Sequence, residues 1–375
     1  MCGISGFNFK DEALIKKMNE VTRYRGPDAT GIFLADKISL GNNRLSIIDL
    51  DSSANQPMED TTGRYVIVYN GEVYNYRELK KELKDSYSFR TESDTEVILA
   101  SFIKWGTLCV EKLNGIFAFA IWDKEKEELF LARDHAGIKP LYYYLDQGKF
   151  IFASEIKSIL EHPVSRILNR EAFGLYFQLF YVPAPLTMFQ GISKFPLGSF
   201  GLFKNGNLAL SSYTYSVLPP RENIKTKSQA VQETKNVVTQ SVCSQMVSDR
   251  PVGIFLSGGL DSNIILASLK SSGYKNIDTF SIGFELNSKQ AEDKFNTDFN
   301  LARRSSEFFG TRHHEVTLGH EEIPQLFEDV VWHLDEPVAV PTALSVLKLS
   351  RYATDKVKVI LTGNGGDELF LGYER

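Results

Sequence analysis

An uninterrupted apolar run, Val252–Leu256, is the strongest secondary-structure signal in the chain. Five uncharged residues are typical of a strand that is buried on both faces of a parallel sheet. Gly258 and Gly259 follow and permit a tight turn, and Ser262–Lys270 then has the pattern of a helix. A strand, a glycine turn and a helix N-terminus together present backbone N–H groups to an anion, most simply a phosphate. No Gly-Lys-Ser/Thr ends the turn, so it is not a Walker P-loop.

Further apolar segments in the C-terminal half alternate with a helical one. Strands are expected at Asp278–Phe284 and Val357–Thr362, with a helix at Asn300–Phe309 between them. This alternation predicts an α/β domain with a parallel sheet, whose ligands lie at the carboxyl ends of the strands. Asp261 and Asp367 are then expected at that edge. Both suit Mg²⁺, which takes one or two carboxylates besides phosphate oxygens and water.

The N-terminal part shows more strand alternation than helical periodicity, which predicts a layered α+β domain. Strands are expected at Gly3–Phe9, Ile32–Leu34, Val66–Asn70, Ala118–Trp122, Leu129–Asp134 and Phe150–Ser154. Helices are expected at Glu12–Val21, Tyr76–Leu83, Asp94–Trp105, Glu155–Glu161 and Asn169–Phe180.

A polar stretch, Ser211–Lys227, separates the two patterns and contains two adjacent prolines, so it is the predicted linker. Just before it, Leu202–Leu210 has the pattern of a hairpin that turns at Asn205-Gly206. The predicted organisation is a first domain over residues 1–210, a linker over 211–227 and a second domain over 228–375.

A helix through Val247 is predicted after the linker, because Thr226 and Gln229 have the spacing of a capping box. An apolar stripe at helical spacing predicts that this helix packs against the second domain's sheet. The stripe consists of Val231, Val238, Val242 and Met246. Cys243 and Cys109 are interpreted as small buried hydrophobic residues, not as metal ligands.

Composition narrows the class of protein. A chain of 375 residues exceeds the usual single-domain size, and 43% hydrophobic with 24% charged residues is typical of a soluble globular protein. A net charge of −5 predicts no nucleic-acid partner, and no apolar run reaches the roughly 20 residues of a membrane span. No signal peptide is visible, and three scattered cysteines favour a cytoplasmic location.

Cys2 is a candidate nucleophile. Removal of the initiator Met would leave Cys2 with both a thiol and a free α-amino group. That amine has an ordinary pKa of about 8, so part of it is neutral at physiological pH and can act as the base for the thiol. Arg44 suits a carboxylate, and Glu72 and Asp94 suit an ammonium group, which together are the two charged ends of an amino acid.

The N-terminal part resembles the glutaminase domain of the glutamine-dependent asparagine synthetases in six ordered motifs. They are Cys2-Gly-Ile-Ser-Gly, Arg25-Gly-Pro-Asp28, Arg44-Leu-Ser-Ile-Ile-Asp49, Asn70-Gly-Glu-Val-Tyr-Asn75, Ser93-Asp94 and Arg133-Asp-His-Ala-Gly-Ile-Lys-Pro-Leu-Tyr-Tyr143. The resemblance implies a four-layered N-terminal-nucleophile sandwich. It also implies that Cys2 attacks the glutamine side-chain amide, which releases ammonia and leaves a thioester.

The same resemblance implies a role for each motif residue. Asn70 and Gly71 would donate to the oxyanion of the tetrahedral intermediate. Glutamine would be bound by Arg44, Leu45, Ser46, Ile47, Ile48, Asn70, Gly71, Glu72 and Asp94, with its carboxylate at the 44–48 end and its amino group at Glu72 and Asp94.

The C-terminal part is similar to the synthetase domain of the same family. Ser257-Gly-Gly-Leu-Asp-Ser262 resembles the pyrophosphate loop of ATP pyrophosphatases, and Asp335-Glu-Pro337 and Gly365-Gly-Asp-Glu-Leu-Phe370 resemble further synthetase motifs. The resemblance implies ATP binding by Leu256, Ser257, Gly258, Gly259, Asp261, Ser262, Ile282, Thr362 and Gly363, and a metal, Mg²⁺, at Asp261 and Asp367. It implies a carbon–nitrogen ligase that activates aspartate as β-aspartyl-AMP for attack by ammonia. A homodimer is one assembly that it allows.

Two features depart from the family pattern. Asn364 occupies the position at which the family has an acidic residue beside the reaction intermediate, and an amide cannot accept a proton there. The sequence ends at Arg375, whereas family members continue, so the second domain is expected to be incomplete at its C-terminus. The alternatives that stay open are a fragment, a partner chain that supplies the remainder, another carboxylate acceptor such as a sugar acid, or a glutaminase-only or regulatory chain.

Overall fold

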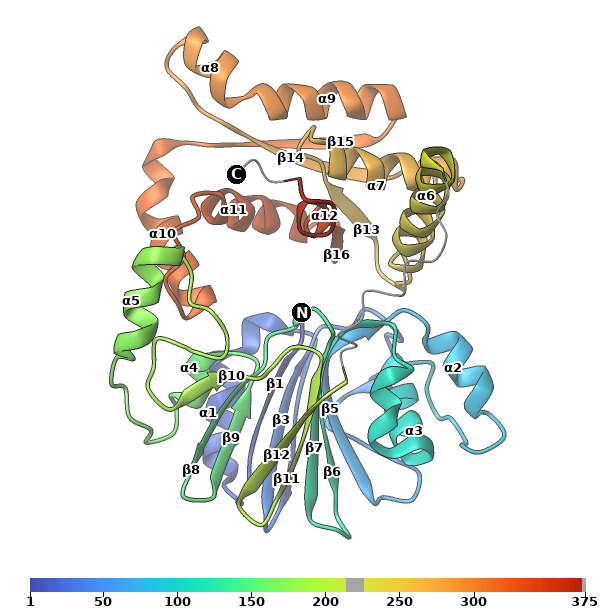
Figure 1. The fold of residues 1–375 in the computed structure, drawn as a ribbon, viewed down its shortest axis with the longest axis vertical. Coiled ribbons are helices and arrows are strands. Elements are labelled where there is room, and N and C mark those ends of the chain that lie inside the picture. Colours follow the sequence, from blue (N-terminus) through green and yellow to red (C-terminus); the bar gives the residue numbers. More distant parts are fainter. Residues whose placement is uncertain (214–225, 373–375) are drawn as a thin grey trace. The chain divides into compact units, whose positions relative to one another are not determined.

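The computed structural model describes residues 1–213 and 226–372. The chain forms two compact units, of which the first comprises Met1–Ser216 and Leu334–Ala339 and the second comprises Val217–His333 and Val340–Arg375 (Figure 1). Most of the predicted linker lies outside the described residues.

Two six-stranded antiparallel sheets form the centre of the first unit. One sheet has the order β10(Ile192–Lys194), β8(Tyr142–Asp146), β9(Lys149–Ala153), β1(Gly3–Phe7), β3(Ile38–Arg44), β2(Ala29–Ala35). The other has the order β12(Asn207–Ser212), β11(Ser199–Lys204), β7(Glu128–Arg133), β6(Gly115–Asp123), β5(Tyr65–Val73), β4(Met58–Glu59).

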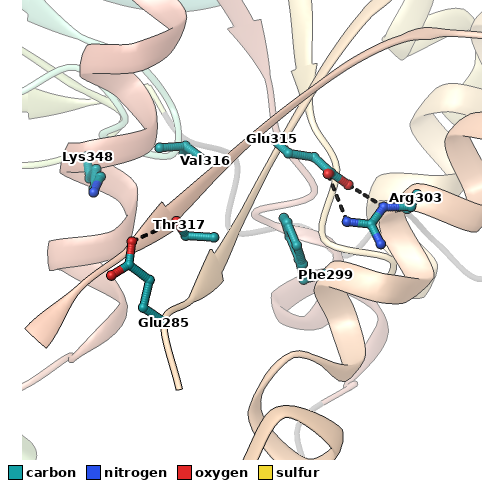
Figure 2. A pocket seen from close by; sticks show the side chains of 7 residues that line it. All are labelled: Glu285, Phe299, Arg303, Glu315, Val316, Thr317 and Lys348. Atoms are coloured by element: carbon teal, nitrogen blue, oxygen red, sulfur yellow. Dashed lines mark hydrogen bonds and ion pairs between the residues drawn. The ribbon is translucent and has the colours of Figure 1, made fainter. Parts of the chain in front are cut away.

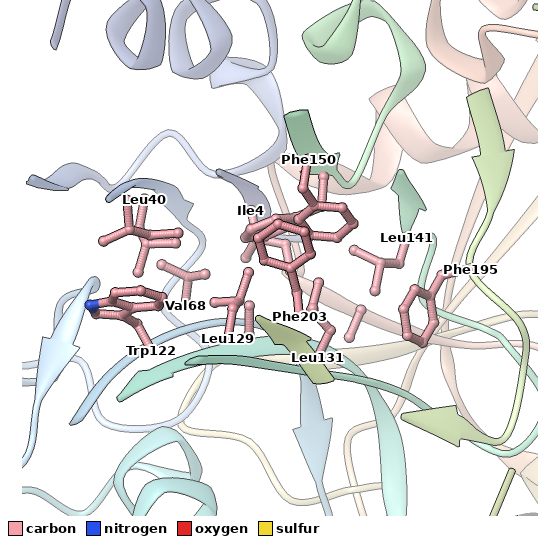
Figure 3. Packing of buried hydrophobic residues seen from close by; sticks show 14 of the residues in the cluster. Ile4, Leu40, Val68, Trp122, Leu129, Leu131, Leu141, Phe150, Phe195 and Phe203 are labelled. Atoms are coloured by element: carbon pink, nitrogen blue, oxygen red, sulfur yellow. The ribbon is translucent and has the colours of Figure 1, made fainter. Parts of the chain in front are cut away.

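The core of the first unit lies between these two sheets, as Figure 3 shows, and includes the buried residues Ile4, Leu40, Val68, Trp122, Leu131, Phe150 and Phe203. Helices cover the outer faces: α1(Glu12–Val21) and α4(Ile156–Ile159) pack on the first sheet, and α2(Tyr76–Leu83) and α3(Asp94–Trp105) lie on the side of the second. α5(Arg170–Leu179) follows α4 in the chain. The result is the predicted α+β sandwich of four layers.

Local signals explain where several of these helices begin. Asp11 accepts a hydrogen bond from Leu14 N at the start of α1, and Ser93 accepts one from Glu96 N at the start of α3. The β11–β12 turn has positive φ at Asn205 and Gly206, as the sequence predicted for a two-residue hairpin loop.

The second unit contains a parallel sheet of order β15(Arg312–Leu318), β14(Asp278–Phe284), β13(Val252–Phe255), β16(Val359–Leu361). Its helices are α6(Lys227–Ser244), α7(Leu260–Ser271), α8(Lys289–Phe295), α9(Thr297–Phe309), α10(Ile323–Leu334, ending in the first unit), α11(Thr342–Thr354) and α12(Gly366–Phe370). Strand order reverses at β13, which has β14 on one side and β16 on the other. The carboxyl ends of β13 and β16 therefore form a topological switch point, where ligands of such sheets bind.

The structure differs from the sequence expectations at β3 and on α6. β3 was not predicted, because Asn42 and Asn43 break the apolar pattern, yet every residue of this strand is buried. The helix predicted to run through Val247 ends at Ser244. Val242 is buried, and Val238 on α6 and Met246 just after it pack in the same cluster, but Val231 is 60% exposed and takes no part in the stripe. None of the helices in residues 1–213 and 226–372 combines the length and the hydrophobicity of a membrane span.

Candidate glutaminase and nucleotide sites

The Cys2 thiol lies at the start of β1, against the end of β3. Its Sγ is 3.4 Å from Leu45 N, which donates to it, and 3.7 Å from Leu45 O. The Arg25 Nε donates to the Cys2 carbonyl oxygen at 2.9 Å and so fixes the main chain of the nucleophile. Two of the predicted motifs, at residues 25–28 and 44–49, thus meet at Cys2.

Burial controls the protonation of this end of the chain. It raises the pKa of the Cys2 thiol and lowers the pKa of the α-amino group, carried here by Met1, to about 5. Burial thus favours the neutral form of the Met1 amine and the protonated form of the Cys2 thiol. A thiolate at Cys2 therefore requires a base that takes the thiol proton, and the α-amine that becomes free on Cys2 after removal of Met1 is the candidate.

The segment after β3 is held in a defined loop. The buried Arg44 guanidinium donates to Asp51 O at 3.0 Å, to Asn55 Oδ1 at 2.9 Å, and to the carbonyls of Ile48 and Asp49. Arg44 therefore shapes the loop that the resemblance assigns to the glutamine carboxylate.

The Arg-Gly-Pro-Asp motif braces the same loop from the other side. Asp28 accepts a hydrogen bond from Ser46 N at 2.9 Å, and Asp28 N donates to Arg44 O at 3.1 Å. Gly26 is required by close approach, because a Cβ there would lie 2.2 Å from Asn43 O. These contacts place Ser46 and, beyond it, the buried Ile47 and Ile48.

Asn70 is buried in β5 with 1% exposure, and neither its Oδ1 nor its Nδ2 has a hydrogen-bond partner. Such a group is rare, because an unpartnered buried amide costs about 1–3 kcal/mol. Gly71 follows, and a Cβ there would lie 2.3 Å from Ile116 O, so only glycine fits. The Asn70 amide is therefore a donor without a protein partner, and it lies next to Gly71, where the backbone leaves no room for a side chain. This combination is typical of groups that bind a ligand.

The two acidic residues lie at neighbouring positions of the same unit. Asp94 begins α3 and accepts hydrogen bonds from Tyr69 Oη at 2.7 Å and Val73 N at 3.0 Å. Burial raises the pKa of the Asp94 carboxyl to about 6 despite these donors. Glu72 lies on β5, one residue before Val73, and is partly buried.

Lys139 lies in the Arg133–Tyr143 motif, and sequence reasoning assigned no role to it. Its side chain is buried, and burial lowers its pKa while the negative charge of Glu72 acts in the opposite sense. The loop that carries it is fixed by Asp134, which accepts hydrogen bonds from Lys139 N and Ile138 N. The electrostatic interaction of this buried lysine with Glu72 and Cys2 is a feature that only the tertiary structure reveals.

The phosphate-loop candidate connects β13 to α7. Ser262 Oγ lies 3.2 Å from Ser257 Oγ and donates to Gly259 O at 3.2 Å, which closes the loop on itself. Gly258 has φ +77°, and a Cβ there would lie 2.6 Å from Asp298 O. Both facts require glycine at this turn.

The Thr362–Asp367 loop packs against this one. A Cβ on Gly366 would lie 2.4 Å from Asp261 Oδ2, and one on Gly363 would lie 2.9 Å from Asp261 Cβ. The two loops follow β13 and β16, so both belong to the switch point. Asn364 is exposed in the second loop.

The remaining predicted nucleotide residues lie on the adjoining strands. Leu256 is buried and donates its N–H to Phe280 O of β14, and Ile282 is a partly buried residue of β14. Asp261 and Asp367, the predicted Mg²⁺ ligands, are partly buried residues of α7 and of α12, which follows the second loop. Among the described residues, no group of three or more His, Cys, Asp or Glu side chains could hold a metal ion. Two carboxylates beside a phosphate loop fit Mg²⁺, whose other ligands are phosphate and water oxygens.

Comparison with known proteins gives the family. Residues 1–214 match a model described as a glutamine amidotransferase domain, and residues 233–375 match one described as asparagine synthase. A Methanocaldococcus jannaschii protein classed as a glutamine-hydrolysing asparagine synthetase is 37% identical over 100% of this chain and 76% of its own length. The chain belongs to the glutamine-hydrolysing asparagine synthetase family.

Other members of this family are similar over the whole chain. Asparagine synthetase 1 of Bacillus subtilis is 36% identical, and asparagine synthetase B of Escherichia coli is 33% identical. The chain covers 59% and 65% of the lengths of these two asparagine synthetases.

One pocket lies outside the residues that the asparagine synthetase resemblance assigned. It has a volume of about 520 Å³ and is lined by Glu285, Phe299, Arg303, Glu315, Val316, Thr317 and Lys348 (Figure 2). Its charged groups already have partners: Arg303 binds Glu315 at 2.8 Å, Thr317 donates to Glu285 at 3.2 Å, and Lys348 contacts Glu322. We assign no ligand to it.

Proposed function

We propose that this chain releases ammonia from glutamine at Cys2 and activates aspartate with ATP as β-aspartyl-AMP, with release of PPi. Ammonia then attacks the acyl carbon, which forms asparagine and AMP. The observation that carries the glutaminase half is the position of the Cys2 thiol beside Leu45, in the same unit as the buried, unpartnered Asn70 amide.

Glutamine hydrolysis follows from the groups at Cys2. The α-amine that becomes free on Cys2 takes the thiol proton, and the sulfur attacks the side-chain amide carbon. Asn70 Nδ2 and the Gly71 N–H donate to the oxyanion, which is typically worth about 10²–10³ in rate per donor. The C–N bond then breaks, nitrogen leaves as ammonia with the proton from the amine, and water hydrolyses the thioester to glutamate.

Charge complementarity supports the placement of the substrate's ends. The guanidinium of Arg44 is buried and hydrogen-bonded to carbonyl oxygens of its loop, so its contribution to binding the carboxylate would be the positive charge that it holds there. Asp94 and Glu72 supply negative charge for the ammonium group. The pKa of Asp94, about 6, leaves it ionised at neutral pH.

The second unit offers the switch-point loops for ATP. The Ser257–Ser262 turn would hold the pyrophosphate, with Leu256 and Ile282 beside the adenosine and Thr362-Gly363 next to it. Mg²⁺ bound by Asp261 and Asp367 would neutralise charge on the leaving pyrophosphate. Asn364 would then hydrogen-bond near the intermediate without serving as its base.

The test is asparagine synthesis by the natural protein that contains this chain, with either glutamine or ammonium as the nitrogen donor. Cys2→Ala is expected to abolish the glutamine-dependent reaction and to leave the ammonium-dependent, ATP-dependent reaction within twofold. Aspartate-dependent PPi release, compared with release in the presence of sugar acids, identifies the acceptor. Glutamine hydrolysis without any aspartate-dependent PPi release would refute the synthetase half.

A further inference from the structure

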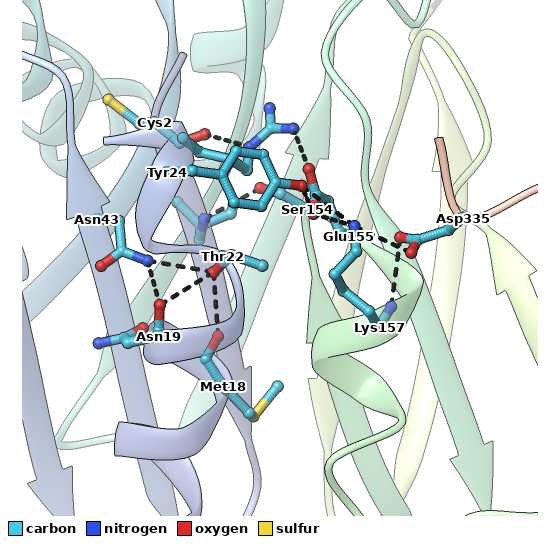
Figure 4. Close-up of polar contacts among 12 residues, drawn as sticks. Cys2, Met18, Asn19, Thr22, Tyr24, Asn43, Ser154, Glu155, Lys157 and Asp335 are labelled. Atoms are coloured by element: carbon cyan, nitrogen blue, oxygen red, sulfur yellow. Dashed lines mark hydrogen bonds and ion pairs between the residues drawn. The ribbon is translucent and has the colours of Figure 1, made fainter. Parts of the chain in front are cut away.

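A series of buried side chains with alternating positive and negative charge connects to the main chain of Cys2. The Arg25 Nη1 binds Glu155 Oε1 at 2.6 Å, Lys157 Nζ binds Glu155 Oε2 at 2.6 Å, and Lys157 Nζ also binds Asp335 Oδ1 at 3.0 Å (Figure 4). All four side chains are at most 9% exposed. We call these four residues the charge network. Because Arg25 Nε holds the Cys2 carbonyl, the network ends on the nucleophile's main chain.

Asp335 reaches this network from a distant part of the sequence. It belongs to Leu334–Ala339, a short segment of the first unit whose preceding and following residues belong to the second. Asp335 has φ +61°, an uncommon value for a residue with a side chain, and Lys157 N donates to its other carboxylate oxygen at 3.3 Å. Strained backbone persists where the surroundings over-determine it, often at functional positions.

Glu336, the residue after Asp335, forms a comparable ion pair with a lysine that is not part of the charge network. Glu336 accepts a hydrogen bond from Met188 N at 3.1 Å and binds Lys194 Nζ at 2.8 Å. Its carboxylate is as buried as that of Asp335. The segment is therefore held by two similar lysine pairs, of which only one continues to the nucleophile.

The network has a specific electrostatic consequence. Loss of one partner in a buried ion pair leaves the other charge uncompensated, so the remaining groups rearrange. Without Asp335, the remaining polar partners of Lys157 described here would be Glu155 and Tyr24. The Tyr24 hydroxyl itself donates to Glu155 Oε2 at 2.5 Å. Such a shift would be transmitted to Arg25 and from there to the Cys2 carbonyl.

We propose that Lys157 and Asp335 are positioning residues for glutamine hydrolysis, which act through Glu155 and Arg25 to fix the main chain of Cys2. The contacts described above connect them to Cys2 through Glu155 and Arg25. This inference rests on the proposed glutaminase function of Cys2. It assigns to the Asp335-Glu-Pro337 motif a role in the first unit's reaction, although the motif lies within the synthetase part of the sequence.

The test uses Asp335→Asn, Lys157→Met and Lys157→Arg in the full protein, with Glu336→Gln as the matched control. Asp335→Asn and Lys157→Met are expected to lower kcat for glutamine hydrolysis about tenfold and to leave KM within twofold. A small displacement of a reacting group slows the chemical step more than it weakens substrate binding. Lys157→Arg should restore most of the rate. The double variant Lys157→Met/Asp335→Asn should be no slower than either single one, because both act in one chain of contacts.

The second readout is the rate constant for labelling Cys2 with 6-diazo-5-oxo-norleucine, expressed per labelled site by intact mass. Asp335→Asn should lower this rate constant, and Glu336→Gln should not. Equal losses in both variants, or fewer labelled sites with an unchanged rate constant, would show a purely structural segment and overturn the inference. If the unmodified protein neither hydrolyses glutamine nor labels at Cys2, the proposed function itself fails.

Discussion

At the scale of single residues, the site is defined by groups whose hydrogen-bonding capacity is used in opposite ways. Arg44 is saturated with carbonyl oxygens and builds a loop, whereas the Asn70 amide is buried without any partner. Side chains of the first kind stabilise the fold, and those of the second kind are stabilised only when a ligand arrives. The two kinds respond differently to substitution.

Asn70→Ala should therefore separate activity from stability. Glutamine hydrolysis is expected to fall by about 10²–10³ in kcat, because an oxyanion donor is lost. The melting temperature should stay the same or rise, since the amide has no partner to lose. Kinetics and thermal unfolding on the same preparation check both. A large fall in melting temperature would mean that the amide is structural.

Asp94 gives a pH prediction. Its pKa of about 6 means that its negative charge disappears as pH falls below 6, so the KM for glutamine should rise about tenfold per pH unit there. Asp94→Asn should have a high KM that does not change with pH between 5 and 8. A wild-type KM that stays constant down to pH 5 would contradict the assignment of Asp94 to the ammonium group.

The same shift affects stability. Because the folded-state pKa of Asp94 is raised from 3.8 to about 6, its contribution to stability is complete below pH 3.8 and is lost as pH rises through 6. At neutral pH a bound ammonium group would compensate this buried charge. Added glutamine should therefore stabilise Cys2→Ala more at pH 7 than at pH 5.

At the scale of elements, turns and strand ends bring the motifs together. The loops after β13 and β16 meet because their strands are neighbours in a parallel sheet, and glycines allow the contact. In the first unit, β1 and β3 are antiparallel neighbours, so the beginning of β1 lies beside the end of β3. This arrangement explains why Cys2 contacts Leu45.

Gly366→Ala tests the contact between the two loops. Its new Cβ would lie 2.4 Å from Asp261 Oδ2, so the Asp261 carboxylate must move away from its position between the two loops. ATP-dependent PPi release is expected to fall at least tenfold, about 1.4 kcal/mol of transition-state stabilisation, while glutamine hydrolysis stays unchanged. Gly174→Ala in α5 is the control, because no atom lies within 4 Å of its added Cβ and the change should stabilise the helix slightly.

At the scale of the whole molecule, the two ligand sites belong to separate units with separate cores. Hydrogen exchange can therefore locate each ligand. ATP with Mg²⁺ should protect peptides that cover 252–270 and 360–370, and glutamine bound to Cys2→Ala should protect peptides that cover 42–50, 68–75 and 91–97. Protection by ATP at the second set alone would refute the proposed nucleotide site. A cytoplasmic location and a homodimer stay predictions.

The sequence by itself determined much of this protein. The apolar run at Val252–Leu256 predicted the strand β13, because a strand that is buried on both faces contains no charged residues. The helices Glu12–Val21, Tyr76–Leu83 and Asp94–Trp105 have the predicted bounds, because caps and periodicity are local properties. The ordered motifs identified the family.

Tertiary structure decided what local patterns cannot encode. β3 is a buried strand because Asn43 finds Asn19 O and Thr22 Oγ1 on other segments, and no pattern within Ile38–Arg44 reveals those partners. The burial of Lys139 and the unpartnered state of Asn70 are likewise properties of the surroundings. Asp335 reaches Lys157 across 178 positions of sequence, and only the folded chain brings those charges together.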